Sequence, residues 1–269
     1  MADRPADTTL AREHSALAPG GSVSSYTVGG ITDVCFGHPK SNSLPSTVLR
    51  SLADAITAAG TQADTRVVVL RSYGTGAFCA GASFDELTAI RDASAGKEFF
   101  MGFARVILAM IRCAKPIVTR VHGKVVGGGV GLVAASDYAL ATGNASLRLS
   151  ELAVGIGPFV VGPVIERRTG SGAFGPMAID ADWRDAAWGE RHGLYARLVD
   201  DIASLDGSVN DLAAKLAAAN PDAVARIKRI AWEGTDDWPR LLEARAEMSG
   251  TLVLSQYTRD AIAAFSARG

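Results

Sequence analysis

The chain has 269 residues, 48% of them hydrophobic, and its 27 Lys and Arg residues nearly balance its 28 Asp and Glu residues. This length is sufficient for one substantial hydrophobic core, and the balanced charge argues against a general nucleic-acid-binding protein, which would carry a basic excess. The three cysteines fit no metal-ligand spacing, which indicates free thiols in a reducing compartment and predicts a cytoplasmic protein without a metal site.

The N-terminal third predicts a short arm followed by strands and a helix. Residues 1–24 carry charges where a signal peptide would be apolar, and we expect a flexible arm there. Alternating apolar residues at 25–28 and 31–36 predict a pair of strands. Pro45 then begins a helical pattern, and the apolar run 66–72 is typical of a buried parallel strand.

The middle third continues this alternation of strands and helices. The segment 84–96 is polar, and we expect it to be mobile, whereas residues 98–112 have helical apolar spacing. Residues 117–121 predict a second buried strand, the almost wholly apolar segment 130–139 a central helix, and residues 146–149 a further strand. No apolar run reaches the roughly 20 residues that a membrane span needs, so no membrane association is expected.

The last third is rich in Ala, Leu and charged residues from about residue 179 and predicts helices alone. Strands that alternate with helices, followed by helices only, indicate an α/β fold. We therefore expect a core over residues 25–200 and a C-terminal helical subdomain over residues 201–269.

Two glycine-containing turns could place backbone N–H groups in a cleft. Gly81, in the turn 78–82 after a predicted strand, lets the chain turn so that the N–H of Ala82 points outward. The run Gly127–Gly129 precedes the apolar helix, and N–H groups at the positive end of a helix dipole attract anions. Two such donors that converge on one carbonyl oxygen would stabilise an enolate.

Glu151 is the candidate acid–base residue. It follows a predicted strand and precedes the Gly- and Pro-rich segment 155–158. Burial there would raise the pKa of the carboxyl group, and a carboxylate with a raised pKa can move protons near neutral pH.

In this order and spacing, the three pieces resemble the crotonase (enoyl-CoA hydratase/isomerase) superfamily. The resemblance implies a spiral of repeated ββα units, an acyl-CoA thioester substrate, no separate cofactor, and a homotrimer or hexamer. It also implies that Ala82 and Gly128 donate the N–H groups of an oxyanion hole and that Glu151 is the acid–base residue.

The resemblance further implies a set of CoA-binding residues. Lys40 and Asn42 match the loop before the first helix of the family, and Ala80 and Ala82 match its first oxyanion loop. The last helix is expected to join subunits and cover CoA, and its matching residues are Phe265 and Arg268.

One departure leaves the reaction open. Hydratases of the family use two glutamates, and Gly131 stands at the first position. A single glutamate suffices for a Δ3,Δ2-enoyl-CoA isomerase, whereas residues 151–163 resemble a bacterial hydratase subgroup, so hydration is slightly favoured. Bulk at Phe159 and Val161 predicts a short or branched acyl group. Candidate replacements for the missing carboxylate are Asp85, Glu86 and Asp92.

Two other classes of protein are also considered. A scaffold without one glutamate could be a non-catalytic acyl-CoA binder. Residues 129–134 fit the Gly-x-Gly-x-x-Ala pattern of an NAD-dependent oxidoreductase, with Glu151 about twenty residues further on, although no strand directly precedes them. His122 and Asp137 are expected to be hydrogen-bonded structural residues rather than catalytic ones.

Overall fold

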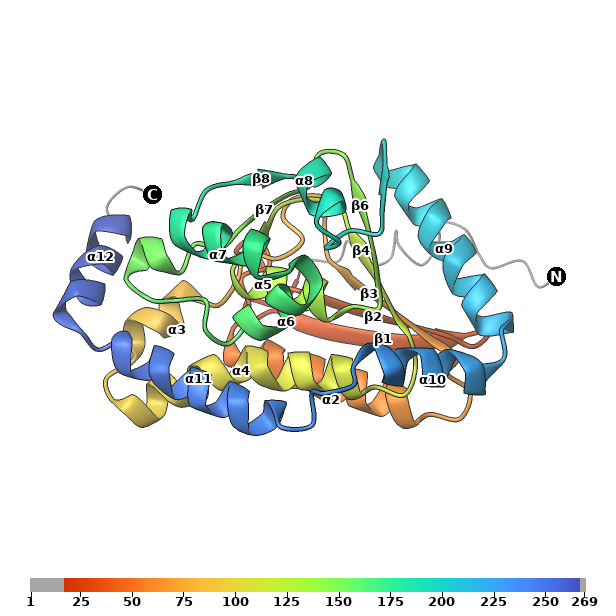
Figure 1. Cartoon of the computed structure of the whole chain (residues 1–269), viewed down its shortest axis with the longest axis horizontal. Helices are drawn as coiled ribbons and strands as arrows, with labels where there is room; N and C mark the ends of the chain where they lie inside the picture. The colour runs from red at the N-terminus through yellow and green to blue at the C-terminus, as the bar shows by residue number, and fades with distance from the viewer. Residues whose placement is uncertain (1–16, 267–269) are drawn as a thin grey trace.

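A computed structural model describes residues 17–266 of the chain, and its centre is a six-stranded sheet (Figure 1). The strands lie in the order β1-β2-β3-β4-β6-β9, with the β1–β2 pair antiparallel and the other pairs parallel. Their bounds are Ser22–Val28, Ile31–Gly37, Val67–Ser72, Ile117–Val121, Tyr138–Thr142 and Arg197–Val199.

Helices cover both faces of this sheet. On one face lie α2 (Ser46–Thr61), α4 (Ala93–Arg112) and α11 (Trp238–Leu252), the last of which packs along α4 (Figure 1). On the other face α9 (Ile202–Ala218) packs Leu205 and Val209 against Val67 and Val69 of β3. Alternate residues of β3 thus enter two cores, which explains the unbroken apolar run that the sequence shows there.

A second, smaller sheet positions the candidate site. It is formed by β5 (Val125–Val126), β7 (Ser146–Arg148) and β8 (Arg184–Asp185). The fully buried helix α5 (Gly128–Ala135) follows β5 in the chain. The remaining elements are α3 (Phe84–Ala89), η1 (Leu152–Val154), α6 (Gly162–Thr169), α7 (Ser171–Asp180), α8 (Ala186–Arg191), α10 (Pro221–Ala231) and α12 (Gln256–Ser266).

The polar segment 84–96 is mostly helical. It contains α3 and the first turn of α4, and both helices have side-chain caps. Ser83 accepts from the N–H of Glu86, and Asp92 accepts from the N–H of Ala95. Some of the polar residues of the segment are therefore helix caps.

The predicted helix over residues 130–139 is too long. α5 ends at Ala135 and β6 begins at Tyr138, so Asp137 lies in the turn between them. Its carboxylate accepts from the N–H of Ile117 and pairs with the buried Lys228 at 2.7 Å. Asp137 is therefore a hydrogen-bonded member of an ion pair, as the sequence predicted.

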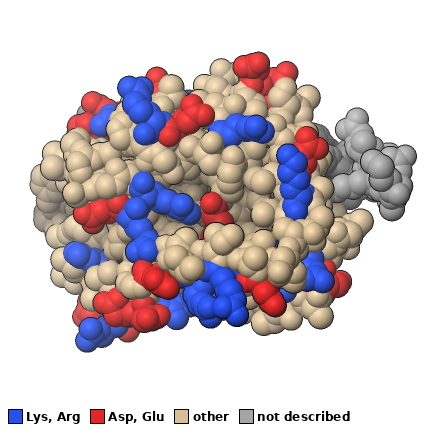
Figure 2. Space-filling model, turned by 45° about the vertical axis from the view of Figure 1, so that its right-hand side comes forward, with Lys and Arg blue, Asp and Glu red and all other residues tan. Residues whose placement is uncertain are grey.

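The prediction of helices alone beyond residue 179 also needs correction. β8 completes the small sheet, and β9 pairs with β6 at the edge of the main sheet. Among the described helices, none is long and apolar enough to cross a membrane. Figure 2 shows acidic and basic side chains interspersed over one face of the molecule, in keeping with the balanced charge.

Candidate functional site

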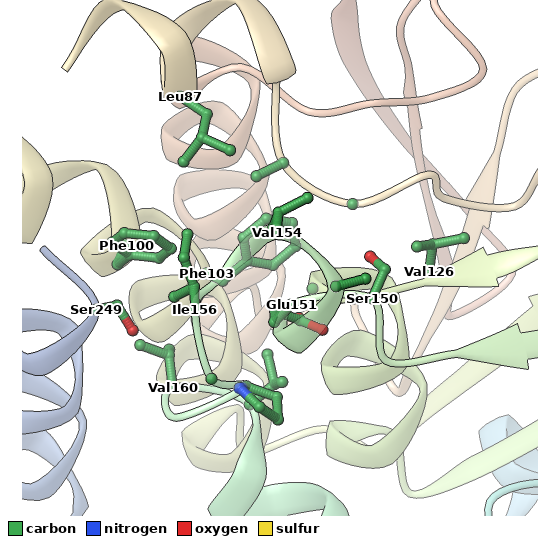
Figure 3. Close-up of a pocket in the computed structure, with 18 of the residues that line it drawn as sticks. Leu87, Phe100, Phe103, Val126, Ser150, Glu151, Val154, Ile156, Val160 and Ser249 are labelled. Carbon is green, nitrogen blue, oxygen red and sulfur yellow. The ribbon is translucent and has the colours of Figure 1, made fainter. Parts of the chain in front are cut away.

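A cavity of about 400 Å³ lies between η1, the small sheet and helices α3, α4 and α11. Much of its wall is apolar, formed by residues that include Phe84, Leu87, Phe99, Phe100, Phe103 and Ile156. Figure 3 shows Glu151 between Phe103 and Ile156 on one side and Ser150 and Val126 on the other. An apolar cavity with a few polar groups is the usual form of a small-molecule site.

Backbone hydrogen bonds hold the two glycine-containing turns side by side. The N–H of Cys79 donates to the carbonyl of Lys124 at 3.3 Å, and the N–H of Val126 donates to that of Cys79 at 2.8 Å. Gly81 has a φ of +92°, and a Cβ at this position would lie 3.2 Å from the carbonyl oxygen of Val126. The chain therefore requires glycine here, both for conformation and for close approach.

Ala82 and Gly128 both line the cavity. Within the described residues, neither N–H donates to a backbone carbonyl. Gly128 is the first residue of α5, where N–H groups have no partner inside the helix. A Cβ on Gly128 would lie 2.3 Å from the ring of Phe103, so glycine is required at this position too.

Glu151 follows β7 in the chain and lies beside the Gly127–Gly128 turn. A Cβ on Gly127 would be 3.0 Å from its Oε1 atom. Oε2 is buried and has no hydrogen-bond partner among the described residues. Burial raises the pKa of Glu151 to about 7, although nearby backbone N–H groups oppose the shift. The carboxyl group can thus both take and give a proton near neutral pH.

The position of the missing family glutamate is filled. A Cβ on Gly131 would lie 2.7 Å from Cγ1 of Val161 and 3.3 Å from Cδ1 of Ile107. A glutamate at residue 131 would therefore clash with apolar side chains. Val161, which was expected to shape the acyl pocket, lines the cavity and also closes this position.

None of the three candidate replacements supplies a second carboxylate to the cavity. Asp85 pairs with Lys40 at the surface, and Asp92 caps α4. Glu86 accepts from the N–H of Ser46 at 2.9 Å and from its hydroxyl at 2.6 Å. Of the described residues that line the cavity, Glu151 is the only Asp or Glu.

The residues predicted to bind CoA are found in different surroundings. Ala80 and Ala82 line the cavity, whereas Lys40 is exposed and outside its lining. Phe265 lies on α12, but its side chain lies outside the described part of the structure, as does the whole of Arg268. α12 packs against η1, where the hydroxyl of Thr258 donates to the carbonyl of Gly155 at 2.9 Å.

Asn42 needs revision as a CoA-binding residue. Its side chain is buried, and its amide donates to the carbonyls of Tyr73 and Ala77, both at 2.9 Å. Its side-chain oxygen accepts from the N–H of His38 at 2.9 Å. The side chain thus holds the loop before the oxyanion turn and has no group left over for CoA.

Replacing Asn42 with Ala should lower the free energy of unfolding by about 2 kcal/mol, because three part-buried backbone groups lose their partner. The residue also has a φ of +55°, which Ala adopts less readily than Asn. Urea denaturation would measure the change. Ser41→Ala, an exposed neighbour with a φ of +53°, is the control for backbone strain. Equal losses in the two variants would contradict the role of the amide.

The sequence interpretation missed Arg148 and Trp183, which also line the cavity. The ring of Trp183 has Nζ of Lys124 at 5.5 Å and Cζ of Arg148 at 6.0 Å from its centroid. Its position in the sequence could have identified Arg148, because it lies on β7, three residues before Glu151. Lys124 directly precedes β5 and Trp183 directly precedes β8, and no local sequence pattern joins them.

His122 lies away from this cavity's lining. It is buried, and its Nδ1 atom lies 3.0 Å from Nη1 of Arg120. Burial and the Arg120 charge lower the pKa of His122 to about 4, so the ring is neutral near pH 7. A structural role fits this environment.

The dinucleotide-binding interpretation does not fit the fold. Its strand should lead directly into the glycine turn. Here β4 of the main sheet ends at Val121, and β5 of the small sheet separates it from the glycines. Glu151 lies in the cavity beside Gly127, where it cannot hold a ribose as the dinucleotide pattern requires.

Comparison with known proteins gives relatives of two kinds. A CoA hydrolase of Mycobacterium tuberculosis, named for a (7aS)-7a-methyl-1,5-dioxo-hexahydro-indene-carboxyl-CoA, is 41% identical over 123 residues, which are 46% of this chain and 49% of the hydrolase. The match therefore spans about half of that relative's length. A crotonyl-CoA hydratase of Syntrophomonas wolfei is 26% identical over 231 residues, 85% of this chain and 88% of the hydratase.

Solved structures and a family model agree on the fold. A putative enoyl-CoA hydratase of Mycobacterium avium paratuberculosis superposes with a TM-score of 0.81 at 25% identity, covering 92% of this chain and 97% of that one. An enoyl-CoA hydratase of Bacillus halodurans gives 0.82 at 19% identity, covering 90% and 99%. The family model for enoyl-CoA hydratase/isomerase matches residues 27–268. As the sequence resemblance predicted, the chain has the crotonase fold and belongs to the enoyl-CoA hydratase/isomerase family.

Proposed function

We propose that this protein hydrolyses a bulky 3-oxoacyl-CoA ester and that Glu151 is its only acid–base residue. The observation that carries the proposal is the single carboxylate at the cavity, with the position of a second one closed by Val161. One carboxyl group must then take a proton from water and return it to carbon.

The proposed reaction needs no more than this one group. Glu151 takes a proton from water, and the hydroxide adds to the C3 carbonyl. The C2–C3 bond then breaks, and its electron pair forms the thioester enolate. The enolate oxygen accepts hydrogen bonds from the N–H groups of Ala82 and Gly128. Glu151 gives its proton to C2, and C3 leaves as a carboxylic acid. Glu151 ends in the ionisation state in which it began.

The size of the cavity supports a larger acyl group than the short or branched one expected from the sequence. An apolar cavity of about 150 Å³ holds one benzene ring, and this one measures about 400 Å³. The mycobacterial relative is named for a bicyclic dioxo CoA ester, so a ring-bearing substrate is the corresponding proposal here.

Hydration of a 2-enoyl-CoA is the second candidate, supported by the relatives named as hydratases. It begins with the same attack of water at C3 and passes through the same enolate. A C3 carbonyl is more electrophilic than an enoyl C3, so hydrolysis demands less of a lone base. Δ3,Δ2-Isomerisation, which also needs one base, and binding without turnover remain outcomes of the test.

The test is incubation of the purified protein with three CoA esters, with mass analysis of the products. The substrates are 2-oxocyclohexanecarboxyl-CoA, crotonyl-CoA and 3-hexenoyl-CoA. Hydrolysis predicts that the first gains one water and becomes heptanedioyl-CoA. If only crotonyl-CoA gains water, the protein is instead a hydratase. If 3-hexenoyl-CoA rearranges without a change in mass, the protein is an isomerase. Release of free CoA would place the attack at the thioester.

The activity should rise with pH and level off above about pH 7. A base must be unprotonated to accept a proton, and burial raises the pKa of Glu151 to about 7. Below that pH the carboxyl group is protonated and inactive as a base. The pH profile of kcat/KM measures this in the free enzyme. A plateau that already begins near pH 4.5 would contradict the raised pKa.

We also propose an oligomeric state and a cellular location. The resemblance to the family supports a homotrimer or hexamer in the cytoplasm, with residues 201–269 as the subdomain that joins subunits. Light scattering of the full chain would give the oligomeric state.

A further inference from the structure

Three side chains form a cluster at the wall of the cavity: Lys124, Arg148 and Trp183. Arg148 and Trp183 line the cavity, and Trp183 is 45% exposed. Lys124 is exposed, and its Nζ atom lies 5.5 Å from the centroid of the Trp183 ring, while Cζ of Arg148 lies 6.0 Å away. Two cations thus share one aromatic ring.

This cluster has no anion of its own. Within residues 17–266, neither Lys124 nor Arg148 pairs with a carboxylate. Arg148 donates from Nε to the carbonyl of Ala181 at 2.5 Å, and its two terminal nitrogens have no hydrogen-bond partner among these residues. An aromatic ring attracts cations but does not neutralise them.

Two other arginines of the chain differ in this respect. Arg120 pairs with Asp206, and Arg184, next to Trp183 in the chain, pairs with Asp180 at 2.5 Å. A half-buried guanidinium with free terminal nitrogens at a cavity wall is suited to a carboxylate from outside the protein, which it can bind through two parallel hydrogen bonds.

The position of the cluster relates it to the reacting groups. Arg148 pairs with Val126 across β5 and β7, and its carbonyl accepts from the N–H of Gly127 at 2.9 Å. It is therefore close in the fold to the proposed oxyanion donor Gly128 and three residues from Glu151.

We infer that Arg148, with Lys124 and Trp183, binds a carboxylate carried by the acyl group, so that the site takes CoA esters of dicarboxylic acids. The inference rests on the proposed function, because hydrolysis of a cyclic 3-oxoacyl-CoA creates a carboxylate on the acyl chain. The phosphates of CoA are the other source of negative charge, and the ligands chosen below separate the two.

The test is calorimetric binding of heptanedioyl-CoA, heptanoyl-CoA and CoA itself, none of which has to be turned over. The protein should bind heptanedioyl-CoA at least about tenfold more tightly than heptanoyl-CoA, as a charge-assisted bond to a carboxylate provides. Arg148→Leu should abolish this preference and leave the affinity for heptanoyl-CoA and CoA within about twofold. Arg148→Lys should retain part of it, since the charge remains but the paired geometry is lost.

Two further variants keep the test decisive. Lys124→Leu changes an exposed side chain, so it should fold normally, and it should reduce the preference for the dicarboxylic ester. Arg191→Leu removes an equally charged, exposed side chain outside the cavity lining and should change nothing.

Three results would overturn the inference. The first is equal affinity of the unaltered protein for heptanedioyl-CoA and heptanoyl-CoA. The second is an equal loss of affinity for all three ligands in Arg148→Leu, which would assign the cluster to the phosphates of CoA. The third is a loss of the preference in Arg191→Leu as large as that in Arg148→Leu. Because binding is the readout, a retained preference without hydrolysis would refute the proposed reaction and leave this inference standing.

Discussion

Glu151→Gln should lower kcat at least about a hundredfold on any CoA ester that the protein turns over. Gln has nearly the same shape as Glu but cannot accept a proton, and a positioned acid–base group contributes about this much to rate. The loss should be large here because Glu151 is the only Asp or Glu among the described cavity-lining residues. Steady-state kinetics at pH 8 measure the change. Activity within a few-fold of the unaltered enzyme would show that another group is the base.

The same variant should be at least as stable as the unaltered protein. In the folded protein burial raises the pKa of Glu151 to about 7, from an ordinary value of 4.5. The folded state therefore holds its proton more tightly, and the free energy of unfolding falls as pH rises from about 4.5 to 7. Above pH 7, Gln removes this cost, which is on the order of 3 kcal/mol.

Glu98→Gln is the matched control for both measurements. Glu98 is exposed on α4 and pairs with Arg105 outside the cavity lining, so kcat should not change. Its pKa is lowered by Arg105, so any stability that it contributes is present at neutral pH and lost in acid. The two glutamates should thus respond to pH with opposite signs, which thermal unfolding between pH 4 and pH 8 would show.

The three pieces that the sequence singled out line one cavity in the structure, and they could be found because each is local. Each consists of a strand and the turn that follows it, and such turns can be identified from glycine and from apolar runs. The closing of position 131 could not be predicted, since Val161 reaches Gly131 only in the folded chain. The cluster around Trp183 was missed for the same reason.

Asn42 shows a second limit of sequence reasoning. A matching motif places a residue in the right loop, but it does not show where the side chain points. Here the amide lies inward and donates to the carbonyls of Tyr73 and Ala77. The polar segment 84–96 shows a related limit, because residues that cap helices are also typical of loops.

Gly128→Ala should lower kcat/KM by about a hundredfold or more and also destabilise the fold. The new Cβ would lie 2.3 Å from the ring of Phe103, so the first turn of α5 or the ring must shift. Displacing one donor of an oxyanion hole costs about this much in rate, and overpacking a core costs about 1–3 kcal/mol.

Gly172→Ala and a double variant separate these two effects. A Cβ on Gly172, in α7, meets nothing within 4 Å, so this variant should be as stable as the unaltered protein or slightly more so and fully active. In Gly128→Ala/Phe103→Ala the clash is gone, and the two substitutions should cost less together than the sum of their separate costs. If the double variant regains activity as well as stability, the rate depends on the path of the backbone at residue 128. Unaltered kcat/KM in Gly128→Ala would contradict the expected displacement of the backbone, because it would mean that the Phe103 ring shifts instead.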